Sequence, residues 1–144
     1  MATVSEFLGD DHRVCDGLWA DVEAADGAPA MAAPFAAFAQ AMQRHFAFEE
    51  EQLFPALDLA TGMHGAGPTA VMRQEHEQMR RLLHTMAGAM AAGDADGVLD
   101  HGDTLLMLIQ QHNLKEEHIV YPLADGRLAA SWPDLLARWP QTEK

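Results

Sequence analysis

Two segments of this chain repeat each other, and the repeat constrains the fold more than any other feature of the sequence. The segment His45-Phe-Ala-Phe-Glu-Glu-Glu-Gln-Leu-Phe-Pro55 aligns without a gap on His112-Asn-Leu-Lys-Glu-Glu-His-Ile-Val-Tyr-Pro122. Upstream, Asp11-His12 aligns on Glu75-His76, and the two histidines precede their partner segments by similar distances, 33 and 36 residues. The chain is therefore predicted to consist of two related helical hairpins.

The composition between the turns favours helices. Ala, Leu, Met, Glu and Gln dominate, Val and Ile are few, and no run alternates between apolar and polar residues. Clusters of Gly and Pro divide the chain into four long segments, for which we expect helices near residues 3–25, 30–59, 68–92 and 95–124. The predicted fold is all-α, an up-down-up-down antiparallel four-helix bundle.

A short fifth helix is expected near residues 131–139. Trp132, Leu135, Leu136 and Trp139 repeat at helical spacing, and Asp134 follows Ser131 as in a capping box. The apolar stripe is expected to cover the bundle or a partner subunit, which leaves a homodimer open. With 144 residues the chain is long enough for one core, so we predict a single domain over 1–144, with the bundle at 3–125.

Charge and cysteine content exclude several classes of function. Nine Lys and Arg against 22 Asp and Glu give a net charge of −13, which disfavours nucleic acid and anionic membranes as partners. The single cysteine, Cys15, excludes a disulfide framework and a thiolate-built metal site. The start of the chain does not have the pattern of a signal peptide and no segment is long and apolar enough to span a bilayer, so a cytoplasmic location is the expectation.

Helical phase places a set of metal-ligating residue types on the inward faces. Residues four apart point the same way on a helix, so His45 pairs with Glu49, and His112 pairs with Glu116. Single histidines lie on the apolar stripes of the other two helices. The candidate ligands are His12, His45, Glu49, His76, His112 and Glu116.

Any one of these residues alone would be weak support for a metal site, because a lone buried histidine or an exposed His/Glu pair is common. Six ionisable groups on core faces, repeated in both halves, would be costly to bury without a metal. Four imidazoles and two carboxylates without thiolate suit two iron ions first, with manganese or zinc as alternatives.

Other polar residues are predicted to lie outside the site. Glu50 and Glu117 are turned about 140° from the histidines, toward the flank of the bundle. His101 is expected to be a buried, hydrogen-bonded residue, with a supporting or channel residue near the site as the alternative. Arg73 and Arg80 are candidates for orienting Glu49 or Glu116, and a surface position is the alternative for Arg73. The remaining histidines are expected to take no part as ligands, and these are His64, His84 and His118.

The order His, HxxxE, His, HxxxE resembles the hemerythrin-like HHE cation-binding family over about residues 3 to 125. This resemblance implies an oxo- or hydroxo-bridged di-iron centre with Glu49 and Glu116 as bridges. Oxygen-carrying members usually have a fifth histidine where this chain has Arg80, and an HxxxxD pair where it has HxxxE. The set is more similar to that of the iron–sulfur-repair and nitric-oxide-responsive members.

We therefore expect a non-haem di-iron protein that binds or senses a small molecule such as dioxygen, nitric oxide or peroxide. The alternatives are a di-iron redox enzyme or an iron–sulfur-repair and nitric-oxide-stress protein, and, second, iron storage or buffering. Binding is favoured over catalysis because the sequence offers no general base or nucleophile apart from the candidate ligands.

Overall fold

The computed structural model describes residues 1–140, of which 84% are helical and none are in strands. The predicted bundle is confirmed, and the last four residues of the predicted domain, 141–144, lie outside the described part. The long helices are α1 (Val4–Ala24), α2 (Ala28–Phe48), α4 (Gly67–Ala91) and α5 (Ala95–Lys115). Shorter helices extend or follow them: α3 (Phe54–Thr61), α6 (Tyr121–Arg127) and α7 (Trp132–Leu136).

Local sequence signals set the ends of several helices. The Thr3 hydroxyl accepts a hydrogen bond from the backbone of Glu6 (3.1 Å), and the Glu6 carboxylate accepts one from the backbone of Thr3 (2.9 Å), which caps the start of α1. Asp94 caps α5 by accepting from Gly97 N–H (2.9 Å). Gly62 ends α3 in the left-handed region (φ 72°), where a side chain would be strained.

Each of the two repeated segments contains a π-turn between its long and its short helix. The π-turns are η1 (Glu49–Leu53) and η2 (Glu116–Val120), and in each the backbone N–H five residues on bonds to the carbonyl of the first glutamate. Pro55 and Pro122 stand in the first turn of the helix that follows, where the missing N–H and the bulk of the ring disfavour a regular α-turn before them. The wider turn rotates the side chains that follow it relative to their directions in a regular α-helix.

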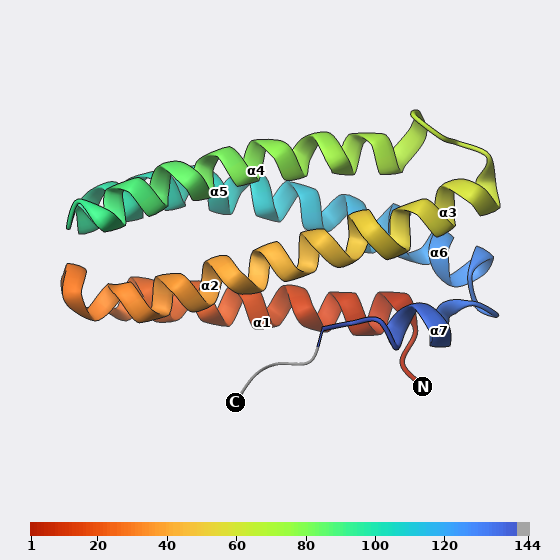
Figure 1. Cartoon of the computed structure of the whole chain (residues 1–144), viewed down its shortest axis with the longest axis horizontal. Helices are drawn as coiled ribbons and strands as arrows, with labels where there is room; N and C mark the ends of the chain where they lie inside the picture. Colours follow the sequence, from red (N-terminus) through yellow and green to blue (C-terminus); the bar gives the residue numbers. More distant parts are fainter. Residues whose placement is uncertain (141–144) are drawn as a thin grey trace.

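The hairpins α1–α2 and α4–α5 pack side by side with alternating chain direction, as Figure 1 shows. Two apolar clusters fill the interior on either side of a polar layer. One is centred on Trp19, Phe38, Met79 and Leu105, and the other on Leu8, Phe54, Met72 and Tyr121. The candidate ligands occupy the layer between the two clusters.

The C-terminal helix α7 is shorter than the predicted 131–139, and it lies against the bundle near the start of α1 (Figure 1). The expected side-chain cap at Ser131 does not form. Trp132 is 4% exposed, and its indole N–H donates to Ala2 O (2.9 Å). Trp139 packs edge-on against Phe7 and Phe48, with ring centroids 5.0 and 5.1 Å away.

Two expectations of burial are wrong, and helix geometry explains both. Ile119 comes seven residues after His112 and would share its buried face in a regular helix, but it is 54% exposed because the π-turn η2 rotates it outward and brings Val120 and Tyr121 inward. His101 is exposed, because the buried stripe of α5 follows a seven-residue repeat that includes Gly102, Leu105, Ile109 and His112. A straight-helix projection drifts from such a repeat by about 20° per seven residues.

Candidate metal centre

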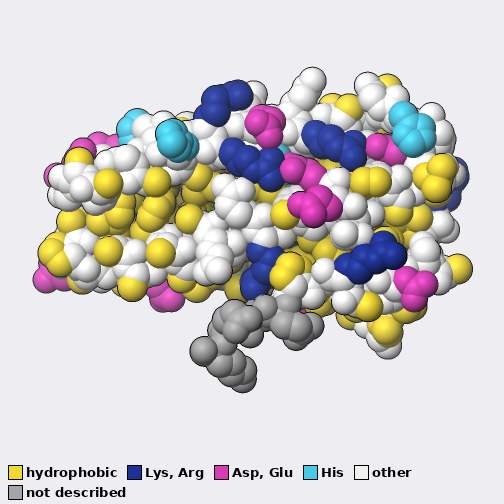
Figure 2. Space-filling view, viewed as in Figure 1, with side chains coloured by type: hydrophobic (Ala, Val, Ile, Leu, Met, Phe, Trp, Pro, Cys, Tyr) yellow, Lys and Arg dark blue, Asp and Glu magenta, His cyan; other side chains and the backbone are white. Residues whose placement is uncertain are grey.

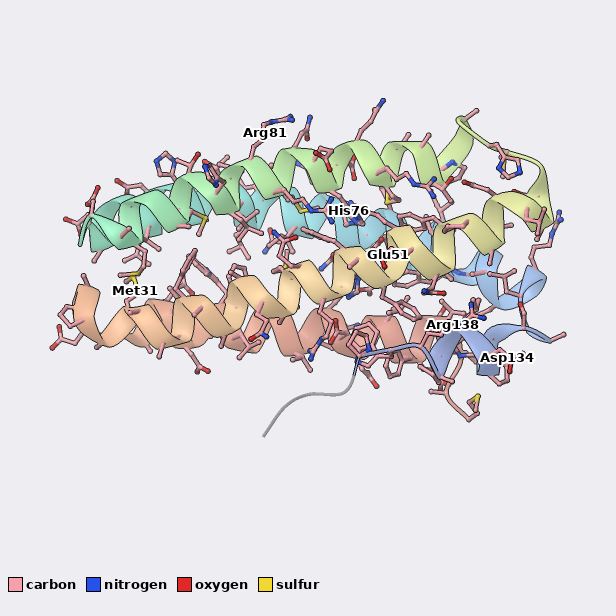
Figure 3. All side chains as sticks on the ribbon, viewed as in Figure 1. Met31, Glu51, His76, Arg81, Asp134 and Arg138 are labelled. Atoms are coloured by element: carbon pink, nitrogen blue, oxygen red, sulfur yellow. The ribbon has the colours of Figure 1, made fainter. Side chains whose placement is uncertain are left out.

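The structure brings all six candidate ligands together in the middle of the bundle. His12 comes from α1, His45 from α2, His76 from α4 and His112 from α5, while Glu49 and Glu116 open the two π-turns. None of the six is more than 4% exposed. In Figure 3, His76 points from α4 toward the interior, whereas Arg81 of the same helix points away from it.

The six side chains form two groups that share Glu116. Glu49, His76, His112 and Glu116 each offer an atom within 4.8 Å of the others, and so do His12, His45 and Glu116. Glu49 also joins the second group, since its Oε2 lies 3.3 Å from His45 Nε2. Two adjacent positions with a shared carboxylate are what a two-metal site requires.

The first group contains four buried atoms with no hydrogen-bond partner among the described residues. They are Glu49 Oε1, His76 Nε2, His112 Nε2 and Glu116 Oε2. His76 Nε2 lies 3.1 Å from Glu49 Oε1, and His112 Nε2 lies 3.2 Å from Glu116 Oε2, yet neither pair is aligned as a hydrogen bond. Leaving such atoms unsatisfied costs free energy, so this donor set fits a bound cation.

Each of the four histidines is held from behind by a carboxylate. His45 Nδ1 lies 2.7 Å from Asp11, and His112 Nδ1 lies 2.8 Å from Glu75. His76 Nδ1 lies 2.6 Å from Glu50, and His12 Nδ1 lies 2.7 Å from Glu117. Because a carboxylate only accepts, each Nδ1 donates, and the Nε2 of a neutral ring presents its lone pair to the centre.

The carboxylates in turn contact cationic side chains. Arg80 donates to both oxygens of Glu50 (2.8 and 2.9 Å), and Arg13 donates to Glu117. Lys115 donates to Glu75, and Arg44 lies 3.9 Å from Asp11. Figure 2 shows charged side chains of both signs gathered over the middle of α4 and α2. The site is thus supported by four radial arms that run from histidine to carboxylate to cation.

The observed contacts correct the predicted roles of the two arginines and agree with the predicted flank position of two glutamates. Arg80 holds Glu50 and not Glu49 or Glu116, and Arg73 pairs with Asp58 (3.0 Å), so neither arginine orients a candidate ligand carboxylate. Glu50 and Glu117 lie at the flank, as helical phase predicts. The sequence analysis did not identify the contacts of any of the four carboxylates with the histidines. A signal was available for Asp11 and Glu75, which stand at equivalent positions of the repeat, next to His12 and His76.

Tyr121 is a further residue of the centre that the sequence analysis missed. Its hydroxyl lies 2.6 Å from Glu49 Oε2, 2.7 Å from Glu116 Oε1, and 3.1 Å from the Nε2 atoms of both His12 and His45. A regular helix would turn Tyr121 about 140° from Glu116, but the π-turn brings it to the same side. The sequence offered one indication of this role, because the equivalent residue of the first half is Phe54 and only the second half has a hydroxyl there.

The electrostatics of the centre follow from its burial and its opposite charges. Burial raises the pKa of Glu116, but His112 and the other neighbouring histidines outweigh this and hold the pKa well below its usual value. Burial lowers the pKa of His76, but the nearby Glu49 and Glu50 carboxylates outweigh this and raise it to about 9. Burial raises the pKa of the Glu50 carboxyl, but hydrogen bonds from His76 and Arg80 outweigh this and lower it to about 2. The buried Glu116 carboxylate is therefore ionised and attracts cations.

The remaining predicted non-ligands lie away from this cluster. His64 falls in the loop before α4, and His64, His84 and His118 are all exposed. No helix within residues 1–140 is both long and apolar enough to cross a membrane.

The fold and the buried cluster define a class: four-helix-bundle proteins with a histidine and carboxylate site of the kind that binds metal ions. The family described as the hemerythrin HHE cation binding domain matches residues 3–124. The chain belongs to this family. No curated protein and no solved structure matches the chain. The family match ends at α6, so α7 lies outside it.

Proposed function

We propose that the chain is a non-haem di-iron protein that binds or senses a small molecule, such as dioxygen or nitric oxide, at its metal centre. Glu49, His76, His112 and Glu116 would hold one iron, and His12, His45 and the same two carboxylates would hold the other. Iron would supply redox-active coordination positions for the small molecule. Imidazole and carboxylate donors suit iron, while manganese and zinc remain alternatives to be tested.

The four partnerless atoms of the first group carry this proposal. Buried polar atoms in native proteins almost always have a partner, and here four of them cluster at one position. The histidine–carboxylate–cation arms add support, because metal-binding histidines are commonly oriented by a carboxylate on the other ring nitrogen.

Tyr121 makes the two positions unequal. Its hydroxyl lies among Glu49, Glu116, His12 and His45, and the second group lacks the partnerless atoms of the first. A phenol has one proton to donate, so it satisfies only one of the two carboxylates at a time. We propose that the Tyr121 oxygen belongs to the second position, and that the small molecule binds on the side that Tyr121 does not occupy.

The same residue supports a second candidate, a redox enzyme that reduces peroxide or nitric oxide. Reduction of peroxide to two waters takes two electrons and two protons; two bound ferrous ions would supply one electron each, and Tyr121 is a buried hydroxyl that can hold and pass a proton within the site. Binding remains the first proposal, because the four partnerless atoms that carry it require only a bound cation and no turnover. Iron storage and iron–sulfur repair have no specific observation in their favour.

The proposal is tested by nitrosylation and azide binding of the iron-loaded protein. We expect both ligands to change the visible spectrum of the wild type, and the change to be lost in His112→Ala. His101→Ala is the matched control, since it removes an exposed histidine from the same helix and should leave the change intact. A wild type loaded with iron that responds to neither ligand would contradict the proposal.

A further inference from the structure

The two halves of the repeat differ at the residue that follows each ligand-bearing HxxxE histidine, which is Phe46 in the first half and Asn113 in the second. Phe46 is 2% exposed, and its ring stacks on His76 with centroids 4.2 Å apart. The Arg80 guanidinium lies 5.3 Å from the Phe46 ring and donates to Gln43 (3.1 Å). The seam between α2 and α4, which is the line along which the two helices meet, is thus closed by the Phe46 ring on the inside and the Arg80 guanidinium on the outside.

The related seam between α5 and α1 differs at two of the three equivalent positions, because both halves keep the glutamine. The alignment of the halves places Asn113 at Phe46, Gln110 at Gln43, and Asp16 at Arg80. All three of these residues line a surface groove of about 600 Å³. The second half therefore lacks both the aromatic ring and the guanidinium that close the first, and the surface there is hollowed.

Asn113 also lines a small cavity inside the bundle, next to the centre. The cavity has a volume of about 10 Å³, close to the space that one water molecule requires. Three candidate ligands reach it, and the rest of its wall is mostly apolar. Its lining is His12, Cys15, Met42, His45, Phe46, Met79, Ile109, His112 and Asn113. Asn113 is the residue shared by this cavity and the outer groove.

Further along the same seam, Trp19 closes the gap between α1 and α5. Its ring crosses to α5 at Gly102, where an added Cβ would come within 2.2 Å of a ring carbon. The indole therefore packs directly on the backbone of α5 and blocks passage there. The stretch beside Asn113, about three turns along the helix from Gly102, has no such cover.

We infer that small uncharged molecules reach the metal centre through the seam between α1 and α5, and that Asn113 controls their passage. Asp16, Glu23 and Glu117 outnumber Arg13 on the walls of the groove, so the field there opposes anions. The mostly apolar cavity behind Asn113 holds no more than a very small molecule. The identity of the final ligand rests on the proposed function, whereas the route does not.

Cys15 provides a reporter of this route, because it is the only cysteine in the chain, lines the cavity and is 5% exposed. The probe is methyl methanethiosulfonate, an uncharged reagent whose methylthio group is transferred to the thiolate while methanesulfinate leaves. Labelling of the metal-loaded protein is followed by mass spectrometry at fixed pH, under conditions where the rate does not depend on added urea, so that global unfolding does not contribute.

Asn113→Phe copies the closed half of the repeat and is expected to slow labelling roughly tenfold, which corresponds to about 1.4 kcal/mol in the barrier. Asn113→Ala should accelerate labelling. Met107→Phe adds the same ring to α5 at a position that is 61% exposed and outside both cavities, and it should leave the rate unchanged. The anionic sulfonatoethyl reagent should react more slowly than the uncharged one.

Wild-type labelling rates in both Asn113 variants would overturn the inference, and so would equal slowing by Met107→Phe. If Asn113→Phe does not fold, the absence of acceleration in Asn113→Ala decides against the route. In the iron-loaded protein, Asn113→Phe should reduce the association and dissociation rates of nitric oxide by the same factor and leave Kd unchanged. A wild type without any nitrosyl signal refutes the proposed function, while the labelling result still decides the route.

Discussion

Removal of bound metal is expected to destabilise the bundle strongly, because buried polar atoms of the centre are then left with neither a metal ion nor a hydrogen-bond partner. Four such atoms are buried in the first group. At about 1–3 kcal/mol for each unsatisfied group, their cost lies in the range of about 4–12 kcal/mol. Protonation of histidines and penetration of water relieve part of it, so we take the lower end. For a chain of this length about 4 kcal/mol corresponds to a fall of roughly 8–16 °C in Tm.

The assay is thermal unfolding followed by circular dichroism at 222 nm, before and after chelation and again after reconstitution with iron. Tm should fall on chelation and recover with metal in the wild type and in His101→Ala. In His112→Ala the difference between the two states should shrink, because one ligand of the first group is gone. A wild type whose Tm changes by less than about 2 °C on chelation would refute the reasoning that the buried cluster depends on a cation.

Three further predictions concern the surroundings of the centre. Glu50→Gln should weaken metal affinity about 10–100-fold because Glu50 orients His76, whereas Glu51→Gln on the exposed side should not; competition with a chromophoric chelator measures both. Tyr121→Phe should destabilise the metal-free protein by about 1–3 kcal/mol in urea unfolding, since it removes a partner of buried carboxylate oxygens, and unchanged stability would contradict that role. Burial raises the pKa of Cys15 to about 11 by disfavouring the charged thiolate, which is the reactive form, so its labelling rate should keep rising about tenfold per pH unit from pH 7 to 10; a plateau near an ordinary thiol pKa of about 8.5 would show that the thiol is not buried.

Periodicity and the repeat were sufficient to predict the fold and the meeting of the six candidate ligands. Within a regular helix, a spacing of four residues fixes relative direction, so His45 with Glu49 and His112 with Glu116 follow directly from the sequence. The inward direction of His12 and His76 followed from their positions on the apolar stripes of their helices. The predicted all-α bundle with a short C-terminal helix is confirmed, and the single-domain organisation stays a prediction.

The missed features share a cause, which is departure from the ideal helix. Tyr121 enters the centre because a π-turn adds a residue to the turn before it, and Ile119 leaves the core for the same reason. His101 is exposed because the stripe of α5 follows a seven-residue period. Long side chains such as Glu50 and Arg80 reach across helices, and helical phase gives their direction but not their partner. Pro122 and the Phe-to-Tyr difference within the repeat were the available signals.

We propose that this chain holds two irons between its repeated hairpins. The most direct test is the metal content of the protein purified from its native host, measured together with the visible spectrum in the presence and absence of azide. We expect about two irons per chain, one for each of the two groups of ligands, and a charge-transfer band that azide shifts. Zinc alone, or less than one metal ion per chain, would contradict it.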